Sequence, residues 1–213
     1  MKITVVYDNC SSKRGLKTGW GFSCLVETGD MPPLLFDTGD NGDAILSNMK
    51  ELGIDPGGIG VIFISHRHHD HTGGLSAVLA VNYNAVVYLP VSTSLQVPDR
   101  KVIKVSRPVS ISETVFSTGE LKGIEQALGV KTDRGIVVIT GCSHPGVGEI
   151  LDAAADYGDI FGIIGGFHGF RDFSRLDGLS FISPCHCTQH TAEISRLFPD
   201  QYIACGAGLE LEI

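Results

Sequence analysis

The sequence lacks any long hydrophobic run. No segment approaches the roughly 18 consecutive apolar residues that a membrane-spanning helix needs. The N-terminal segment MKITVVYDNC also lacks the apolar core of a secretory signal, because Thr4 interrupts its few apolar residues and Asp8 ends them. These absences predict a cytoplasmic protein that does not associate with a membrane.

Positive charge is scarce as well. The 213 residues include 16 Lys and Arg against 24 Asp and Glu, which gives a formal net charge of −8. Such a surface lacks the basic patch through which proteins bind nucleic acid, and anionic membranes repel it. We therefore expect a small-molecule partner. The sequence carries no sign of an oligomeric state.

Cysteine pairs of the CxxC type are absent. The six cysteines are scattered along the chain, and in a cytoplasmic protein they are expected to be thiols rather than disulfides. Glycine, in contrast, is plentiful at 27 residues, and 43% of the chain is hydrophobic. Many tight turns and an ample core indicate an α/β protein with a single domain over residues 1–213.

Short runs rich in Val, Ile and Phe alternate with segments whose apolar residues have helical spacing. The predicted strands are 3–7, 22–27, 34–36, 61–64, 86–89, 102–105, 136–140, 160–164, 181–183 and 202–204. The predicted helices are 43–52, 73–81, 145–157 and 189–198.

The stretch HRHHDH, residues 66–71, directly follows a predicted buried strand. Side chains alternate in an extended segment, so His66, His68 and Asp70 are expected to point to one side. His71 points elsewhere. The first two histidines can bind one metal ion, while Asp70 and His71 reach a neighbouring one. Imidazole and carboxylate suit Zn²⁺, Mn²⁺ or Fe²⁺, so the stretch predicts a metal site, with Zn²⁺ as the expected ion.

The pattern His-x-His-x-Asp-His after a strand resembles the signature of the metallo-β-lactamase superfamily, and FDTG at 36–39 resembles its upstream aspartate motif. More narrowly, YDN, GFSCLVETG, SHRHHDHTGGL, VITGCSHPG, IGGFH and PCHCT resemble the branch that includes a dihydropterin-forming synthase of methanopterin biosynthesis. The match extends over essentially the whole chain. It implies an αβ/βα four-layer sandwich, two mixed sheets flanked by helices, with one or two metal ions along the sheet edges.

The resemblance also implies the remaining ligands. His144, in GCSHPG, resembles the histidine of the third motif and would complete the shell of the first ion, although a histidine there can instead cap the helix. His186, in PCHCT, resembles the last-motif histidine and would join Asp70 and His71 on the second ion. Asp37 of FDTG is expected to orient the metal loop by hydrogen bonding, or else to be a turn carboxylate.

The chain has no clear aspartate where the superfamily usually places a bridging ligand. Cys142 follows a predicted strand in a place that such an aspartate can occupy, and His168 of GGFH also ends a strand. Either can be a ligand. His168 can equally contact substrate or transfer a proton, and Cys142 can be a packing residue. We favour His168 slightly as a site residue, and the number of ions stays open at one or two.

A metal site of this kind predicts hydrolysis. A bound ion lowers the pKa of water from ~15.7 towards ~7 and polarises the bond to be attacked. Asp70 is expected to hold the nucleophilic water and accept its proton, and His168 is the second candidate catalytic residue. The expected substrate contains an ester, lactone, amide or phosphoester bond. It is anionic if Arg67 or Arg171 contacts it.

Three alternatives to hydrolysis remain. A synthase of the methanopterin type would bind a departing diphosphate while an arylamine displaces it from a pterin. A di-iron oxidoreductase is disfavoured, because such relatives typically have a glutamate in the position of His68. A non-catalytic metal or ligand sensor would bind metal without turnover. The segments 91–100 and 107–129 are expected to cover the metal edge, but no motif in them decides between these functions.

Overall fold

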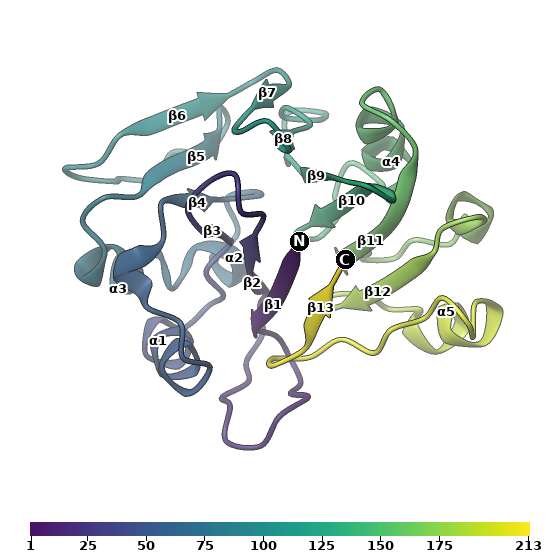
Figure 1. Cartoon of the computed structure of the whole chain (residues 1–213), viewed down its shortest axis with the longest axis horizontal. Coiled ribbons are helices and arrows are strands. Elements are labelled where there is room, and N and C mark those ends of the chain that lie inside the picture. The colour runs from purple at the N-terminus through teal and green to yellow at the C-terminus, as the bar shows by residue number, and fades with distance from the viewer.

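The computed structural model describes all 213 residues. Two sheets face each other, and helices cover the outer face of each one (Figure 1). The first sheet has the order β13-β1-β2-β3-β4-β5-β6 and contains β1 (Lys2–Tyr7), β2 (Ser23–Glu27), β3 (Leu34–Phe36), β4 (Val61–Phe63), β5 (Val86–Pro90), β6 (Val102–Val105) and β13 (Glu210–Glu212). The second has the order β12-β11-β10-β9-β8-β7 and contains β7 (Val109–Ser110), β8 (Val115–Ser117), β9 (Leu128–Thr132), β10 (Gly135–Thr140), β11 (Ile160–Gly166) and β12 (Phe181–Cys185).

The helices form the two outer layers. They are α1 (Gly42–Glu51), α2 (His69–Thr72), α3 (Leu75–Val81), α4 (Val147–Ala155) and α5 (Thr191–Leu197), with short 3₁₀ turns η1 (Pro56–Gly58) and η2 (Phe173–Leu176). Apolar residues of α1 and α3 pack on the first sheet, and those of α4 and α5 pack on the second. The αβ/βα sandwich with two mixed sheets is thereby confirmed. No helix is long and apolar enough to cross a membrane.

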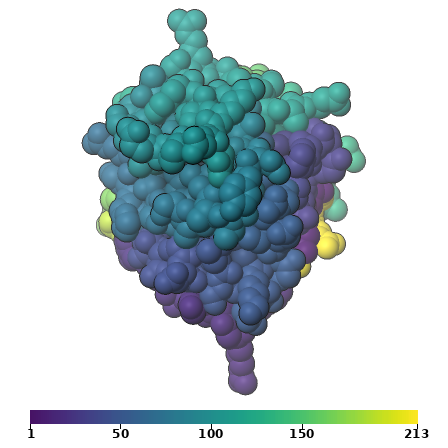
Figure 2. Space-filling view, turned by 90° about the vertical axis from the view of Figure 1, so that its left-hand side faces the viewer, coloured from purple at the N-terminus to yellow at the C-terminus, as the bar shows by residue number.

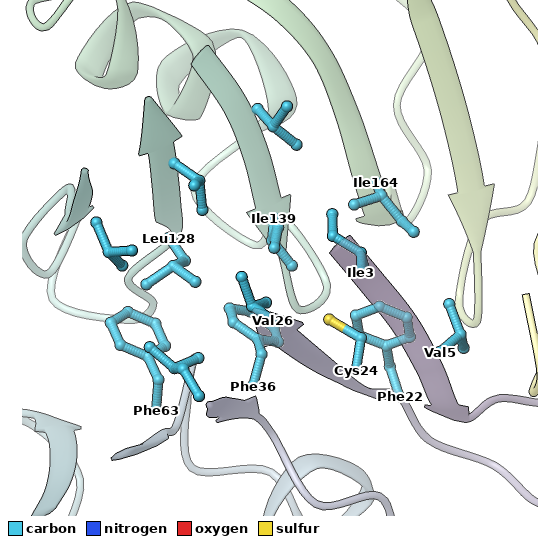
Figure 3. Packing of buried hydrophobic residues seen from close by; sticks show 14 of the residues in the cluster. Ile3, Val5, Phe22, Cys24, Val26, Phe36, Phe63, Leu128, Ile139 and Ile164 are labelled. Carbon is cyan, nitrogen blue, oxygen red and sulfur yellow. The ribbon is translucent and has the colours of Figure 1, made fainter. Parts of the chain in front are cut away.

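The core between the sheets follows from the period of two along each strand. In β3, Leu34 and Phe36 face the opposite sheet, whereas Leu35 faces the helices. Phe36 stacks on Phe63 with ring centroids 5.5 Å apart and meets Phe22 edge-on at 6.1 Å. These rings are fully buried with apolar residues of both sheets around them (Figure 3).

The direction of the strands determines where a site can form. Strands β3, β4 and β5 are parallel, and β1 runs the same way because both it and β3 are antiparallel to β2. In the other sheet, β10, β11 and β12 are parallel. Residues after the carboxyl ends of parallel strands meet at one edge of their sheet, and ligands collect there in open α/β sheets.

Some predicted elements differ from the structure. The predicted strand 202–204 is wrong, because Tyr202 forms only an isolated bridge to Ile182. Strand β13 is absent from the predicted strands because its sequence, ELE, is mostly charged. It nevertheless pairs with β1 at the edge of the sheet. Segment 107–129 was expected only to cover the metal edge, but it supplies β7 and β8 of the second sheet. Helix α4 begins at Val147, after the predicted start at 145.

Replacing Phe36 with alanine tests the core between the sheets. Because the ring is fully buried, Phe36→Ala should lower the free energy of unfolding by about 3–5 kcal/mol, measured by urea denaturation. Tyr83→Ala is the aromatic control, since Tyr83 is 73% exposed, and it should cost less than about 1 kcal/mol. Equal losses for the two variants would contradict this packing.

Candidate metal centre

The candidate site lies where strands of both sheets end. Asp37 follows β3, His66 follows β4, His168 follows β11 and His186 follows β12. Three of these residues, together with Ser143 after β10, have left-handed backbones, with φ of 52° at Asp37, 58° at Ser143, 47° at His168 and 51° at His186. Such conformations cost a non-glycine residue about 1–3 kcal/mol, and they persist mainly at functional sites. Four of the six non-glycine residues with positive φ therefore lie at this edge, which makes it a candidate functional site.

Ligand-type atoms converge at this edge in three overlapping groups. Within each group, all the potential ligand atoms lie within 4.8 Å of one another. The groups are His66, His68 and Asp70; His66, Cys142 and His144; and Asp70, His71, Cys142 and His186. The structure thus brings together all six residues predicted as metal ligands, and it adds Cys142.

The metal loop is only partly extended. His66 and His68 precede α2, whereas Asp70 and His71 lie within its single turn. The expectation of an extended segment through Asp70 is therefore wrong after residue 68. Asp70 nevertheless reaches His66 and His68, because the helical turn brings its carboxylate back to them.

Asp37 fixes two of the imidazoles. Its fully buried carboxylate accepts a hydrogen bond from His71 Nδ1 at 2.6 Å. It also accepts one from Ser65 Oγ at 2.6 Å, and that oxygen in turn lies 2.9 Å from His66 Nδ1. Since the Ser65 proton points to the carboxylate, His66 Nδ1 must be the donor to Ser65. Both histidines then present an unprotonated Nε2 as a ligand, which is the arrangement that orients ligands in metalloproteins.

Glu125 orients His144 in the same way, although no sequence motif predicts this role. Its buried Oε2 lies 2.9 Å from His144 Nδ1 and accepts the His144 backbone N–H at 3.0 Å. Its Oε1 accepts the backbone N–H groups of Gly141, Cys142 and Ser143 at 3.0–3.1 Å. One carboxylate therefore shapes the whole turn after β10. Nothing in the sequence marks it, because Glu125 lies outside every motif.

The last-motif histidine is fixed from the first strand. His186 Nδ1 lies 3.1 Å from Asn9 Oδ1, and the Asn9 amide donates to the His186 carbonyl at 2.9 Å. Asp8 accepts the backbone N–H of His186 at 3.0 Å. The other ring nitrogen, Nε2, lies 3.1 Å from Asp70 Oδ2. His186 is thus turned towards the cluster by the YDN segment.

The electrostatics of the cluster suit a cation. Burial lowers the pKa of His66 and of His71 to about 3, so both imidazoles are neutral. Burial would raise the pKa of Glu125, but the hydrogen bonds from the ring and the backbone N–H of His144 outweigh burial and hold the pKa at about 2. Burial raises the pKa of Asp37 to about 8. The ion-pair partners of Asp37 and Glu125 are histidines, with no Lys or Arg among them. Since buried charge is costly without compensation, this donor set fits a divalent metal ion.

Cys142 and His168 differ in their relation to the cluster. Cys142 is buried, its Sγ lies 3.2 Å from His71 Nε2, and it belongs to two of the three ligand groups. His168 is exposed and belongs to none, although its ring lies 5.4 Å from that of His144. The geometry therefore supports Cys142 as a candidate ligand in place of the usual aspartate, and leaves His168 at the rim.

Other polar residues near the motifs lie outside the ligand groups. His69, Arg67 and Arg171 are exposed. His190 precedes α5, and its Nδ1 lies 3.9 Å from Oε2 of Glu193 in that helix. Cys187 forms a hydrogen bond with Cys142, and this bond, together with burial, raises the pKa of the Cys142 thiol. A nearby cation is therefore required before Cys142 becomes a thiolate.

Substituting Glu125 tests its effect on the site. Glu125→Gln places an amide NH₂ opposite either His144 or the backbone N–H groups, so one set loses its acceptor. Zinc affinity, measured by competition with a chromophoric chelator, should fall by about 10- to 100-fold. Glu149→Gln on the exposed face of α4 is the matched control and should bind zinc like the wild type. Unchanged affinity in a folded Glu125→Gln protein would contradict the assignment.

Comparison with known proteins agrees with this geometry. The model of the metallo-beta-lactamase superfamily matches residues 21–161. The chain is 27% identical, over 85% of its length and 84% of the relative, to the 7,8-dihydropterin-6-methyl-4-(beta-D-ribofuranosyl)-aminobenzene-5'-phosphate synthase of Methanocaldococcus jannaschii.

Solved structures show the same fold. Tm1679, described as a metal-dependent hydrolase of the beta-lactamase superfamily, superposes with a TM-score of 0.80 and 29% identity over 100% of this chain and 99% of its own. The short form of human tRNase Z shares the fold with a TM-score of 0.67 and 14% identity over 100% of this chain and 99% of its own. The chain belongs to the metallo-β-lactamase superfamily.

Proposed function

We propose that the chain is a metal-dependent hydrolase that acts on an ester, lactone, amide or phosphoester bond. The observation that carries this proposal is the cluster of imidazoles, four of which are fixed by a hydrogen bond at Nδ1, beside the buried carboxyl groups of Asp37 and Glu125, which have no Lys or Arg as a partner. The similarity to Tm1679, described as a metal-dependent hydrolase, supports the same class.

We propose that one or two Zn²⁺ ions occupy the cluster. His66, His144 and Cys142 would hold the first ion, and His68 would join them through the overlapping group that it forms with His66 and Asp70. Asp70, His71, His186 and Cys142 would hold the second ion. The thiol favours zinc over harder ions such as Mn²⁺, while Fe²⁺ also accepts imidazole. When bound, the metal supplies an activated water at neutral pH and polarises the bond to be cleaved.

Asp70 is the proposed proton acceptor. Its carboxylate is half-buried, and Oδ2 lies 3.1 Å from His186 Nε2 and 3.7 Å from His71 Nε2. Burial would raise its pKa, but the contact with His186 Nε2 outweighs burial and lowers the pKa below the usual range, so the carboxylate is ionised. It can therefore orient a water molecule and accept its proton at Oδ2.

His168 is the proposed proton donor to the leaving group. It is exposed beside His144, so its ring can reach a bound substrate without acting as a ligand. The left-handed backbone at His168 fixes the direction in which its side chain leaves the strand end. Asp70 and His168 thus divide the two proton transfers of hydrolysis between the interior and the rim of the site.

The synthase reaction is the second candidate function, because one relative is a named synthase with 27% identity. In that reaction an arylamine, rather than water, attacks the pterin carbon and a diphosphate leaves. The metal ligands would be the same, but Asp70 would accept the proton of the amine. A sensor that binds metal without turnover is the remaining alternative.

Asp70→Asn tests the hydrolase proposal. With zinc present, it should lower kcat on 4-nitrophenyl esters or bis(4-nitrophenyl) phosphate by about 10²- to 10⁴-fold, because the proton acceptor is lost. His69→Gln is the matched control, since this neighbouring imidazole is exposed and outside the ligand groups. Retained activity in metal-depleted Asp70→Asn protein would refute the proposal.

The choice between hydrolase and synthase needs a second assay. The zinc-loaded protein is incubated with a pterin diphosphate, with and without an arylamine, and the products are separated by chromatography. A hydrolase should cleave the panel of 4-nitrophenyl esters and bis(4-nitrophenyl) phosphate and should form no carbon–nitrogen product. Formation of that product, with no turnover on the panel, would favour the synthase.

A further inference from the structure

The loop between β1 and β2 presents an exposed aromatic ring beside the metal cluster. Trp20 is the only tryptophan in the chain and is 58% exposed. Its ring centroid lies 5.0 Å from that of His186, with the planes tilted by 57°. We propose that Trp20 is a stacking surface for a flat aromatic or heteroaromatic ring of the substrate. This inference rests on the proposed function, because it assumes that the reacting group of the substrate lies at the cluster.

The backbone on each side of Trp20 is fixed. A Cβ on Gly19 would lie 2.1 Å from the Tyr7 hydroxyl, and one on Gly21 would lie 2.4 Å from the carbonyl oxygen of Asp70. Neither position accepts a side chain, so the sequence GWG places one large ring between two closely packed glycines. Gly21 therefore packs closely against the backbone of Asp70, a candidate metal ligand.

Hydrogen bonds fix the same loop to the site. The Gly21 N–H donates to Asn9 Oδ1 at 3.2 Å, and this amide also orients His186. The Asn48 amide of α1 binds both the N–H and the carbonyl of Lys17, at 2.7 and 2.8 Å. The loop forms the lower end of the molecule in both whole-chain views (Figure 1, Figure 2). Trp20 is thus exposed although hydrogen bonds fix its loop, and its ring is not folded back onto the protein surface.

Trp20 and His168 lie beside different parts of the cluster. Trp20 contacts His186 of the second ligand group, whereas the His168 ring lies near His144 of the first. A substrate whose ring stacks on Trp20 would therefore extend across the ligand atoms towards His168. This direction places its reacting bond over the cluster and its leaving group near the proposed proton donor.

The chemistry of the indole defines the ligand class. An exposed indole offers a large flat face, and offset stacking of another aromatic ring on it is favourable beyond the burial of area alone. A puckered ring of equal size buries a similar area against the indole but does not stack on it. Phenyl phosphate and cyclohexyl phosphate therefore form a matched pair, with the same anionic group for the metal and a flat or a puckered ring for Trp20.

The test measures binding of both phosphates to the zinc-loaded protein by calorimetry. The wild type should bind phenyl phosphate about tenfold more tightly than cyclohexyl phosphate, and phenyl phosphate should quench the emission of Trp20. Trp20→Ala should lose the preference, Trp20→Phe should retain most of it, and Tyr83→Ala, an exposed aromatic control on another surface, should leave it unchanged.

Three outcomes would overturn the stacking surface: no preference in the wild type, no binding of either phosphate, or a full preference in Trp20→Ala. The assay needs no turnover, so its failure is separable from that of the hydrolase proposal. If Asp70→Asn loses hydrolysis while Trp20→Ala keeps the preference, the stacking surface alone is wrong. If the preference follows Trp20 while no substrate is hydrolysed, the hydrolase proposal alone is wrong.

Discussion

The candidate metal centre depends on hydrogen bonds that its imidazoles make to buried carboxyl groups. Asp37 orients His71 directly and His66 through Ser65, and Glu125 orients His144. Each bond places the ring proton on Nδ1 and leaves Nε2 unprotonated and facing the cluster. The carboxyl groups therefore select the tautomer as well as the direction of the ring. Glu125 is ionised and buried beside these rings, and a divalent cation would compensate its charge and favour the ionised form of Asp37 as well.

The sandwich gives these groups their common location. The strands that carry them belong to two sheets, and β1, β3 and β4 of one sheet end at the same edge as β10, β11 and β12 of the other. The apolar core between the sheets, with Phe36 and Phe63 stacked in it, fixes the separation of these strand ends. Packing far from the metal ligands therefore determines whether their atoms lie within reach of one ion.

Much of this arrangement is predictable from the sequence, and the rest depends on contacts that a sequence does not reveal. HRHHDH and the strand before it identify the ligand loop, because spacing and local structure agree there. Glu125 is unpredictable, since its partners at 141–144 are distant in sequence and four of its bonds go to backbone groups that any residue provides. Cys142 is an intermediate case. Its position after a strand is evident, but only the fold shows that its sulfur lies against His71.

The central claim is that a metal ion binds between these strand ends. Anomalous diffraction at the zinc edge, from crystals of protein purified without chelator, tests it most directly. We expect one or two peaks within bonding distance of the Nε2 atoms of His71, His144 and His186 and of Cys142 Sγ. Crystals without an anomalous peak there after zinc is added, with the imidazoles turned away from one another, would contradict the account.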